Sequence, residues 1–315
     1  MQIPDLYSRI REEFAKVVVG QEQTLRLILA AYFSRGHILF EGVPGIAKTL
    51  MAKTFAAIVG GEFRRVQFTP DMLPADIIGT MVFSQDEGKF RLHRGPIFCH
   101  FLLADEINRT PPKTQSALLE AMEERQVSIE GELNLLPPDF TVFATQNPIE
   151  YEGTYPLPEA QLDRFMLRIK VDYPQQNEEV EIIRRYDKGF DAQNLAAANL
   201  TDLGIPERFG ELMAEVTAVQ VREEILDYMV EIVRRTRGRR GIALGGSPRA
   251  SIFLLKGAKA LAALSGREFV IPDDVVELVP HVLNHRLILS PEFEIEGRHP
   301  EEVIAEVVGS VEVPR

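Results

Sequence analysis

A glycine-containing segment with a lysine and a threonine, GVPGIAKTL at residues 42–50, has the composition of a phosphate-binding loop. It lies between an apolar run, HILFE, and a run of helix-forming residues, MAKTFAAIV. In such a loop Lys48 reaches the β- and γ-phosphates and Thr49 ligates Mg²⁺. Ala47 stands where the usual pattern has glycine, so an ordinary strand-to-helix turn is the alternative. The candidate nucleotide-binding residues are Gly42, Val43, Pro44, Gly45, Ile46, Ala47, Lys48, Thr49 and Leu50.

Two adjacent acids follow a second apolar run, FLLADE, which ends in Asp105 and Glu106. Hydrolysis of a phosphoanhydride needs one carboxylate near the Mg²⁺ shell and another that orients and deprotonates water. We therefore assign Asp105, with Thr49, to the metal and Glu106 to the water. The alternative is that both acids only cap the helix that follows.

Two further side chains are placed where they could touch the γ-phosphate. Asn147 in ATQNP ends another predicted strand, although an asparagine before Pro148 is also a common turn residue. Arg164 in PEAQLDRFM precedes a fifth strand, where a guanidinium could neutralise charge on a transferring phosphoryl group. The alternative for Arg164 is an exposed ion pair with Asp163 or Glu159.

Alternating strands and helices must position these residues. Such alternation predicts an α/β fold with a parallel five-stranded sheet covered on both faces and a ligand crevice at the carboxyl ends of the strands. One intervening helix is clear in TPPKTQSALLEAMEER, with Thr110 as the expected cap and Pro111 in the first turn. The predicted strands are HILF from His37, RVQF from Arg65, FCHFLLA from Phe98, FTVFAT from Phe140 and MLRIKV from Met166.

Two interruptions of this alternation are predicted to be β-hairpins, at residues 79–95 and 126–140. Strand signals fade after Pro174, and helical periods dominate from there to about Leu289. We therefore expect a nucleotide-binding core at residues 1–174 and an all-helical domain at 175–315. In the latter, Ser247 is expected to cap a helix that ends at Gly266.

Composition limits the function further. The 315 residues are 45% hydrophobic, and no apolar stretch reaches the roughly 20 residues of a membrane-spanning helix. The N-terminus has no signal-peptide core, and a single cysteine, Cys99, permits no internal disulfide, so we expect a cytoplasmic protein. A net charge of −12 argues against a nucleic-acid partner, although the basic run 234–240, RRTRGRR, leaves that alternative open.

Four strings together resemble the MoxR family of AAA+ ATPases: GVPGIAKT, FLLADEINR, FATQNPIEYEGTYPLPEAQLDRF and GGSPRAS. The resemblance covers nearly the whole chain and implies a P-loop AAA+ core with a helical lid domain. It also implies ATP and Mg²⁺ as ligands. Lys48 then matches the phosphate-binding lysine, Thr49 and Asp105 the magnesium-associated residues, and Glu106 the catalytic base.

The resemblance also assigns the more distant residues. Asn147 matches sensor 1, Arg164 the arginine finger that completes a neighbour's site, and Arg249 in SPRAS the sensor 2 arginine of the lid. Without the resemblance, Arg249 would be interpreted as a solvated residue of a first helical turn. Gly20 and Gln21 in VVGQE are similar to the segment that AAA+ proteins lay against the adenine.

If Arg164 acts in trans, hydrolysis requires a closed homo-oligomer, and the family suggests a hexameric ring. The resemblance implies a chaperone-like ATPase that remodels or matures client proteins, including proteins with von Willebrand A domains. Two alternatives are an AAA+ motor on nucleic acid and a regulatory module that binds nucleotide without turnover. A small-molecule kinase is a weaker alternative, because no acceptor pocket is identifiable in the sequence.

Overall fold

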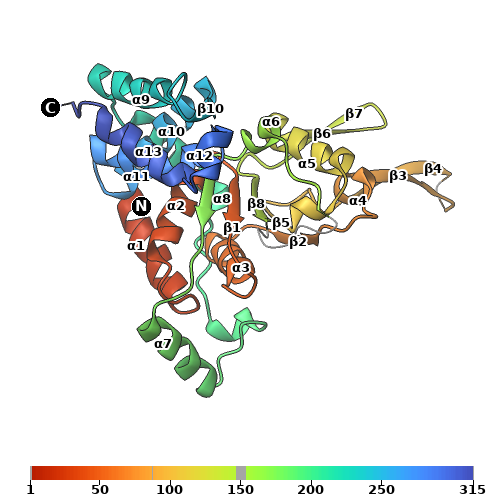
Figure 1. The fold of residues 1–315 in the computed structure, drawn as a ribbon. Coiled ribbons are helices and arrows are strands. Elements are labelled where there is room, and N and C mark those ends of the chain that lie inside the picture. The colour runs from red at the N-terminus through yellow and green to blue at the C-terminus, as the bar shows by residue number, and fades with distance from the viewer. Residues whose placement is uncertain (1, 87, 147–153, 315) are drawn as a thin grey trace.

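A computed structural model describes residues 2–86, 88–146 and 154–314. Its centre is a five-stranded parallel sheet in the order β2-β5-β8-β1-β9 (Figure 1). β5 and most of β8 are buried, as expected for parallel strands covered on both faces. The five predicted strands are therefore confirmed, with small shifts at their ends. They are β1 (Ile38–Glu41), β2 (Phe63–Gln67), β5 (Phe101–Asp105), β8 (Thr141–Gln146) and β9 (Leu167–Lys170).

The register of the sheet aligns the carboxyl ends of its strands. Gln67 pairs with Asp105 across β2 and β5, and Glu41 pairs with Gln146 across β1 and β8. The loop that starts at Gly42 follows β1, and Asp105 and Glu106 lie at the end of β5. Only β8 lies between these two strands, so the loop and the two acids are close to each other.

Alternate residues of the inner strands β1, β5 and β8 enter two hydrophobic clusters on opposite faces of the sheet. Phe101 and Phe143 pack into the cluster that also contains Phe55 of α3 (Lys48–Val59). Leu102 and Val142 pack into the other cluster, which includes α5 (Pro112–Glu124). This two-residue alternation follows from the geometry of a strand and fixes the sheet between helices.

The start of α5 corrects one expectation. The helix begins at Pro112, and the capping position is Pro111, which is extended at φ −60° and ψ 152°. Thr110 is fully buried and its hydroxyl has no partner among the described residues, so it is not the cap. The residue before a proline avoids helical geometry, and here two consecutive prolines move the helix start downstream.

Both predicted hairpins are present and antiparallel. β3 (Gly79–Ser84) pairs with β4 (Lys89–Arg94), and β6 (Gln126–Ile129) pairs with β7 (Glu132–Leu135). They extend from the sheet on the side away from the C-terminal helices (Figure 1). Both carry apolar side chains in solvent: Val82, Phe83, Phe90, Leu133 and Leu135.

The remaining chain is mainly helical. Ser247 caps α10 by accepting from the Arg249 amide at 3.2 Å, as predicted, and α10 ends two residues before Gly266. The expectation of an all-helical C-terminal part is wrong in one detail, since β10 (Ile242–Leu244) and β11 (Ile288–Leu289) form a two-stranded antiparallel sheet. Each strand is too short to give a periodic signal. The helices are α1 (Ile3–Ala15), α2 (Glu22–Tyr32), α7 (Gln176–Asp187), α8 (Ile205–Ala218), α9 (Glu223–Arg235), α10 (Pro248–Leu264), α11 (Pro272–Leu283), α12 (Pro291–Ile295) and α13 (Pro300–Ser310). Short helical turns connect other elements: α4 (Pro74–Ile78), η1 (Ile107–Arg109), α6 (Glu159–Leu162) and η2 (Leu195–Ala198).

One hydrophobic cluster runs through both expected domains. It contains α1, α2 and α3 as well as α8, α9, α10 and α11. Phe209 of α8, for example, lies 5.0 Å from the Tyr32 ring of α2. The boundary at residue 174 therefore stays a prediction. Among the described residues, no helix is both long enough and apolar enough to cross a bilayer.

Candidate functional site

A cavity of about 820 Å³ opens at the carboxyl ends of the central strands. Its floor is the loop at residues 44–50, and one side is formed by the ends of β5 and β8. Val17, Val18, Val19 and Gln21 also line the cavity, as does α7 with its flanking segments. The predicted loop and the predicted acids are thus brought together in one cavity of a size suited to a nucleotide.

The backbone of the loop explains two of its residues. A Cβ on Gly42 would lie 2.6 Å from the Val171 carbonyl oxygen, so only glycine fits there. Ala47 has φ +65°, a left-handed conformation that costs an alanine about 1 kcal/mol. This conformation explains why the general pattern has glycine at that position.

The loop offers unpaired donors to an anion. The amides of Gly45, Ile46 and Ala47 donate to no acceptor within the described part of the chain. They precede the first turn of α3, where free N–H groups and the helix dipole favour negative charge. These donors fit the phosphates of a nucleotide.

Lys48 is folded back onto the same loop. Its Nζ donates to the carbonyl oxygens of Gly42 and, at 3.1 Å, of Val43. Burial lowers the pKa of Lys48, and the nearby charges of Asp105 and Glu106 partly offset this effect. Phosphate oxygens would give the ammonium charged acceptors in place of neutral carbonyls.

The two acids are held by a buried hydroxyl. Thr145 Oγ1 donates to Asp105 Oδ1 at 2.5 Å and accepts from the Glu106 amide at 2.9 Å. Glu106 has φ +56°, so this second bond holds a backbone conformation that a non-glycine residue rarely adopts. Thr145 therefore ties the Asp105 carboxylate to the backbone of Glu106.

Two side chains of β2 contact the acids, and the sequence analysis missed them. Arg65 Nη2 lies 2.7 Å from Asp105 Oδ2, and Gln67 Nε2 donates to Glu106 Oε2 at 2.6 Å. Arg65 and Gln67 are two residues apart and so lie on one face of the strand. That spacing was visible in the sequence, but their partners follow from the pairing of β2 with β5.

Magnesium fits the cavity only together with a nucleotide. Thr49 and Asp105 both line it, while no cluster of three acidic, histidine or cysteine side chains able to hold a metal occurs in the described residues. Mg²⁺ commonly uses one or two protein ligands and takes the rest from water and phosphate. A hydroxyl, a carboxylate and a triphosphate match that pattern.

The wall formed by α7 was also missed. Gln21 and the valines at 17–19 line the cavity, and the adenine-facing role of Gly20 and Gln21 stays a prediction. Ile183, Tyr186 and Phe190 of α7 and the segment after it line the cavity as well. Gly20 is not part of the lining. A Cβ there would meet the Glu178 carboxylate at 2.2 Å, so Gly20 allows α7 to approach this segment.

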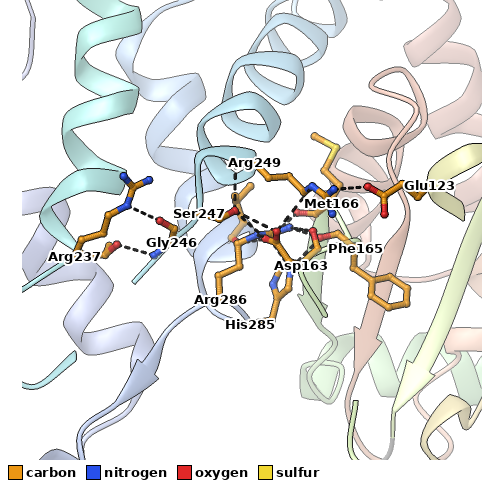
Figure 2. Close-up of polar contacts among 12 residues, drawn as sticks. Glu123, Asp163, Phe165, Met166, Arg237, Gly246, Ser247, Arg249, His285 and Arg286 are labelled. Atoms are coloured by element: carbon orange, nitrogen blue, oxygen red, sulfur yellow. Dashed lines mark hydrogen bonds and ion pairs between the residues drawn. The ribbon is translucent and has the colours of Figure 1, made fainter. Parts of the chain in front are cut away.

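Arg164 and Arg249 do not line the cavity. Both instead pair with Glu123 of α5. Arg164 Nε lies 2.9 Å from its Oε2. Arg249 Nη2 donates to its Oε1 (Figure 2). The expected alternative partners of Arg164 were Asp163 and Glu159, so the observed acid is a different one. Asn147 lies outside the described residues.

Comparison with known proteins agrees with this geometry. A family model described as "ATPase family associated with various cellular activities (AAA)" matches residues 37–167. A model of the AAA lid domain matches residues 234–307. The sheet, the phosphate-binding loop and the acidic strand end thus define a P-loop ATPase of the AAA class.

Similar proteins narrow the class to one family. The chain is 46% identical over 312 residues to "Chaperone MoxR1" of Mycobacterium tuberculosis, covering 96% of this chain and 81% of that one. It is 45% identical over 309 residues to the uncharacterized protein YeaC of Bacillus subtilis, covering 98% and 95%. A crystal structure of a candidate ATPase from Cytophaga hutchinsonii matches with a TM-score of 0.91 at 40% identity, covering 99% and 96%. The chain belongs to the MoxR family of AAA+ ATPases.

Proposed function

We propose that this chain hydrolyses ATP with Mg²⁺ and uses the energy to remodel client proteins. The observation that carries the proposal is the cavity that unites Lys48, Thr49, Asp105 and Glu106. Lys48 and the loop amides bind the β- and γ-phosphates, and Thr49 with Asp105 would hold the metal. The bound Mg²⁺ neutralises phosphate charge. Glu106 orients the attacking water and accepts its proton.

We also propose that the active form is a homo-oligomer, a ring of six subunits as the family suggests. Arg164 and Arg249 lie together at Glu123 rather than in the cavity of their own chain. This placement supports a role for both arginines at the nucleotide of a neighbouring subunit. A head-to-tail interface of this kind closes into a ring.

Mixed assemblies test this arrangement. Arg164→Ala keeps the phosphate-binding loop but lacks the finger, and Lys48→Ala keeps the finger but binds nucleotide poorly. Each variant alone should be nearly inactive, whereas a mixture should recover phosphate release. Arg184→Ala, which removes an exposed arginine on α7 whose one ion pair among the described residues is with Glu181, is the control and should keep parental turnover. Inactive mixtures whose co-assembly is shown by light scattering would contradict the trans arrangement.

The client is proposed to be a protein, and the family suggests partners with von Willebrand A domains. The two hairpins support this proposal, because Phe83 and Phe90 form an exposed edge-to-face pair with ring centroids 5.3 Å apart. Exposed apolar side chains of this kind suit transient contact with protein. A purified von Willebrand A domain protein should raise ATP turnover, and Phe83→Ser should remove that stimulation while basal turnover remains.

The proposed place of action is the cytoplasm, and nucleic acid is not the proposed partner. In the basic run 234–240, Arg235 pairs with Glu231, and Arg239 pairs with Glu306. These pairs support a structural role for that run within an acidic chain. Any DNA binding by a motor would weaken steeply with salt, so a salt titration with labelled duplex tests this choice.

A further inference from the structure

A buried arginine just after α11 holds the short segment that leads into β9 (Figure 2). The Arg286 side chain is 2% exposed. Its Nε donates to Asp163 Oδ1 at 2.7 Å, and its Nη2 donates to the carbonyl oxygens of Asp163 and Phe165 at 2.8 and 2.6 Å. Its Nη1 donates to the carbonyl oxygens of Met166, at 3.4 Å, and of Val282.

These contacts use the full hydrogen-bonding capacity of the guanidinium. An arginine side chain has five N–H donors, and four of the six hydrogen-bond contacts of Arg286 are with residues 163–166, the other two being with Val282 and His285. Burial lowers its pKa to about 10, partly offset by the charge of Asp163, so the group stays protonated at neutral pH. A lysine would keep the charge but could not reproduce this planar set of contacts.

The carboxylate of Asp163 extends the connection to α10. Ser247, the cap of α10, donates to Asp163 Oδ2 at 3.1 Å. Arg249 Nε lies 3.9 Å from the same oxygen. Asp163 therefore lies between Arg286 and the start of α10, and the next residue in the chain is Arg164.

We infer that Arg286 is a positioning residue for the arginine pair Arg164 and Arg249, linking movement of α10 and α11 to the placement of that pair. The inference rests on the proposed function, because it concerns the same reaction. A displacement of α11 that carries Arg286 must move residues 163–166 or break several buried bonds. None of the residues that Arg286 contacts lines the nucleotide cavity, so its effect falls on the arginines rather than on ATP binding.

The first test compares kcat with KM. Arg286→Lys should lower kcat for ATP by about tenfold or more, a part of the roughly 10³- to 10⁵-fold that a transition-state arginine supplies. KM and the calorimetric Kd for ATP should stay within about twofold. Arg267→Lys is the matched control, since Arg267 makes a bidentate pair with Asp274 in the same helical part and does not contact residues 163–166. It should keep parental kcat.

The second test uses the asymmetry of mixed assemblies. Arg286→Lys added to the Lys48→Ala protomer, which donates the finger, should lower the recovered activity by about tenfold or more. The same change added to the Arg164→Ala protomer should leave the recovery intact, because the arginines of that subunit are not used. Equal loss from either protomer would indicate a merely structural effect and would overturn the inference.

The third test does not depend on activity. Hydrogen exchange of the peptide spanning residues 162–167 should accelerate in Arg286→Lys and stay unchanged in Arg267→Lys. If the parental mixture of Arg164→Ala and Lys48→Ala shows no recovery, the trans arrangement fails, but kcat and hydrogen exchange still decide the role of Arg286. Should Arg286→Lys not fold, Asp163→Asn removes one charged acceptor and should give the same pattern with a smaller loss. Parental kcat and exchange in a folded variant would refute the positioning role.

Discussion

Replacing Thr145 by valine should remove the hydroxyl that holds Asp105 and Glu106 in place. Valine has nearly the same shape, so the main change is the loss of two hydrogen bonds at a side chain that is almost completely buried. One of these bonds is made to the Asp105 carboxylate and the other by the Glu106 amide. Both partners would be left without this contact.

The magnitude follows from the type of each bond. A hydrogen bond to a charged group contributes about 1.5 to 3 kcal/mol, and one to a neutral amide contributes about 1 kcal/mol. Asp105 keeps its ion pair with Arg65, which limits the loss. We expect Thr145→Val to lower the free energy of unfolding by about 2 to 4 kcal/mol. Thr145→Ser keeps both bonds and should lose only about 1 kcal/mol for the missing methyl group.

Catalysis should fall as well, because the Glu106 backbone would lose the bond that holds its left-handed conformation. A displacement of about 1 Å in a reacting group can cost about 100-fold in rate. Urea unfolding followed by circular dichroism measures the stability, and phosphate release measures the turnover. If Thr145→Val unfolds within about 0.5 kcal/mol of the parent and turns over ATP equally fast, the assigned role of Thr145 is wrong.

Three further outcomes are expected. Glu106→Gln should bind ATP in calorimetry but lose about 10²- to 10⁴-fold in phosphate release, and unchanged turnover would remove the base assignment. Tyr186→Ala should weaken ATP binding by about 1 kcal/mol through the loss of a cavity wall, with little effect on kcat, and a Kd within about twofold of the parent would contradict this role. His37 is completely buried, and burial lowers its pKa to about 3. The unfolded chain protonates this residue below about pH 6.5 while the folded chain does not, so stability should fall as pH drops from about 6.5 toward 3, by about 2 kcal/mol at pH 5. His37→Gln should show a shallower pH dependence in urea unfolding, and equal slopes would rule out this contribution.

Local signals predicted the elements that hold the site. Each central strand is a short apolar run, and the loop at residues 42–50 and the acids at 105–106 follow directly after two of them. In a parallel sheet these positions meet at one edge, so the cavity could be expected from the order of residues alone. The exact start of α5 was not predicted, because two consecutive prolines keep the chain extended up to Pro111. The β10–β11 pair was not predicted either, because its strands are too short to give a periodic signal.

The sequence by itself therefore determined the chemistry of the site, namely a lysine, a hydroxyl and two acids at the ends of neighbouring strands. Only the tertiary structure decided which groups hold them. Gln67 meets Glu106 because β2 lies next to β5, and Arg286 reaches Asp163 across 123 residues of chain. Pairings over such separations depend on strand order and helix packing, which leave no local pattern in the sequence.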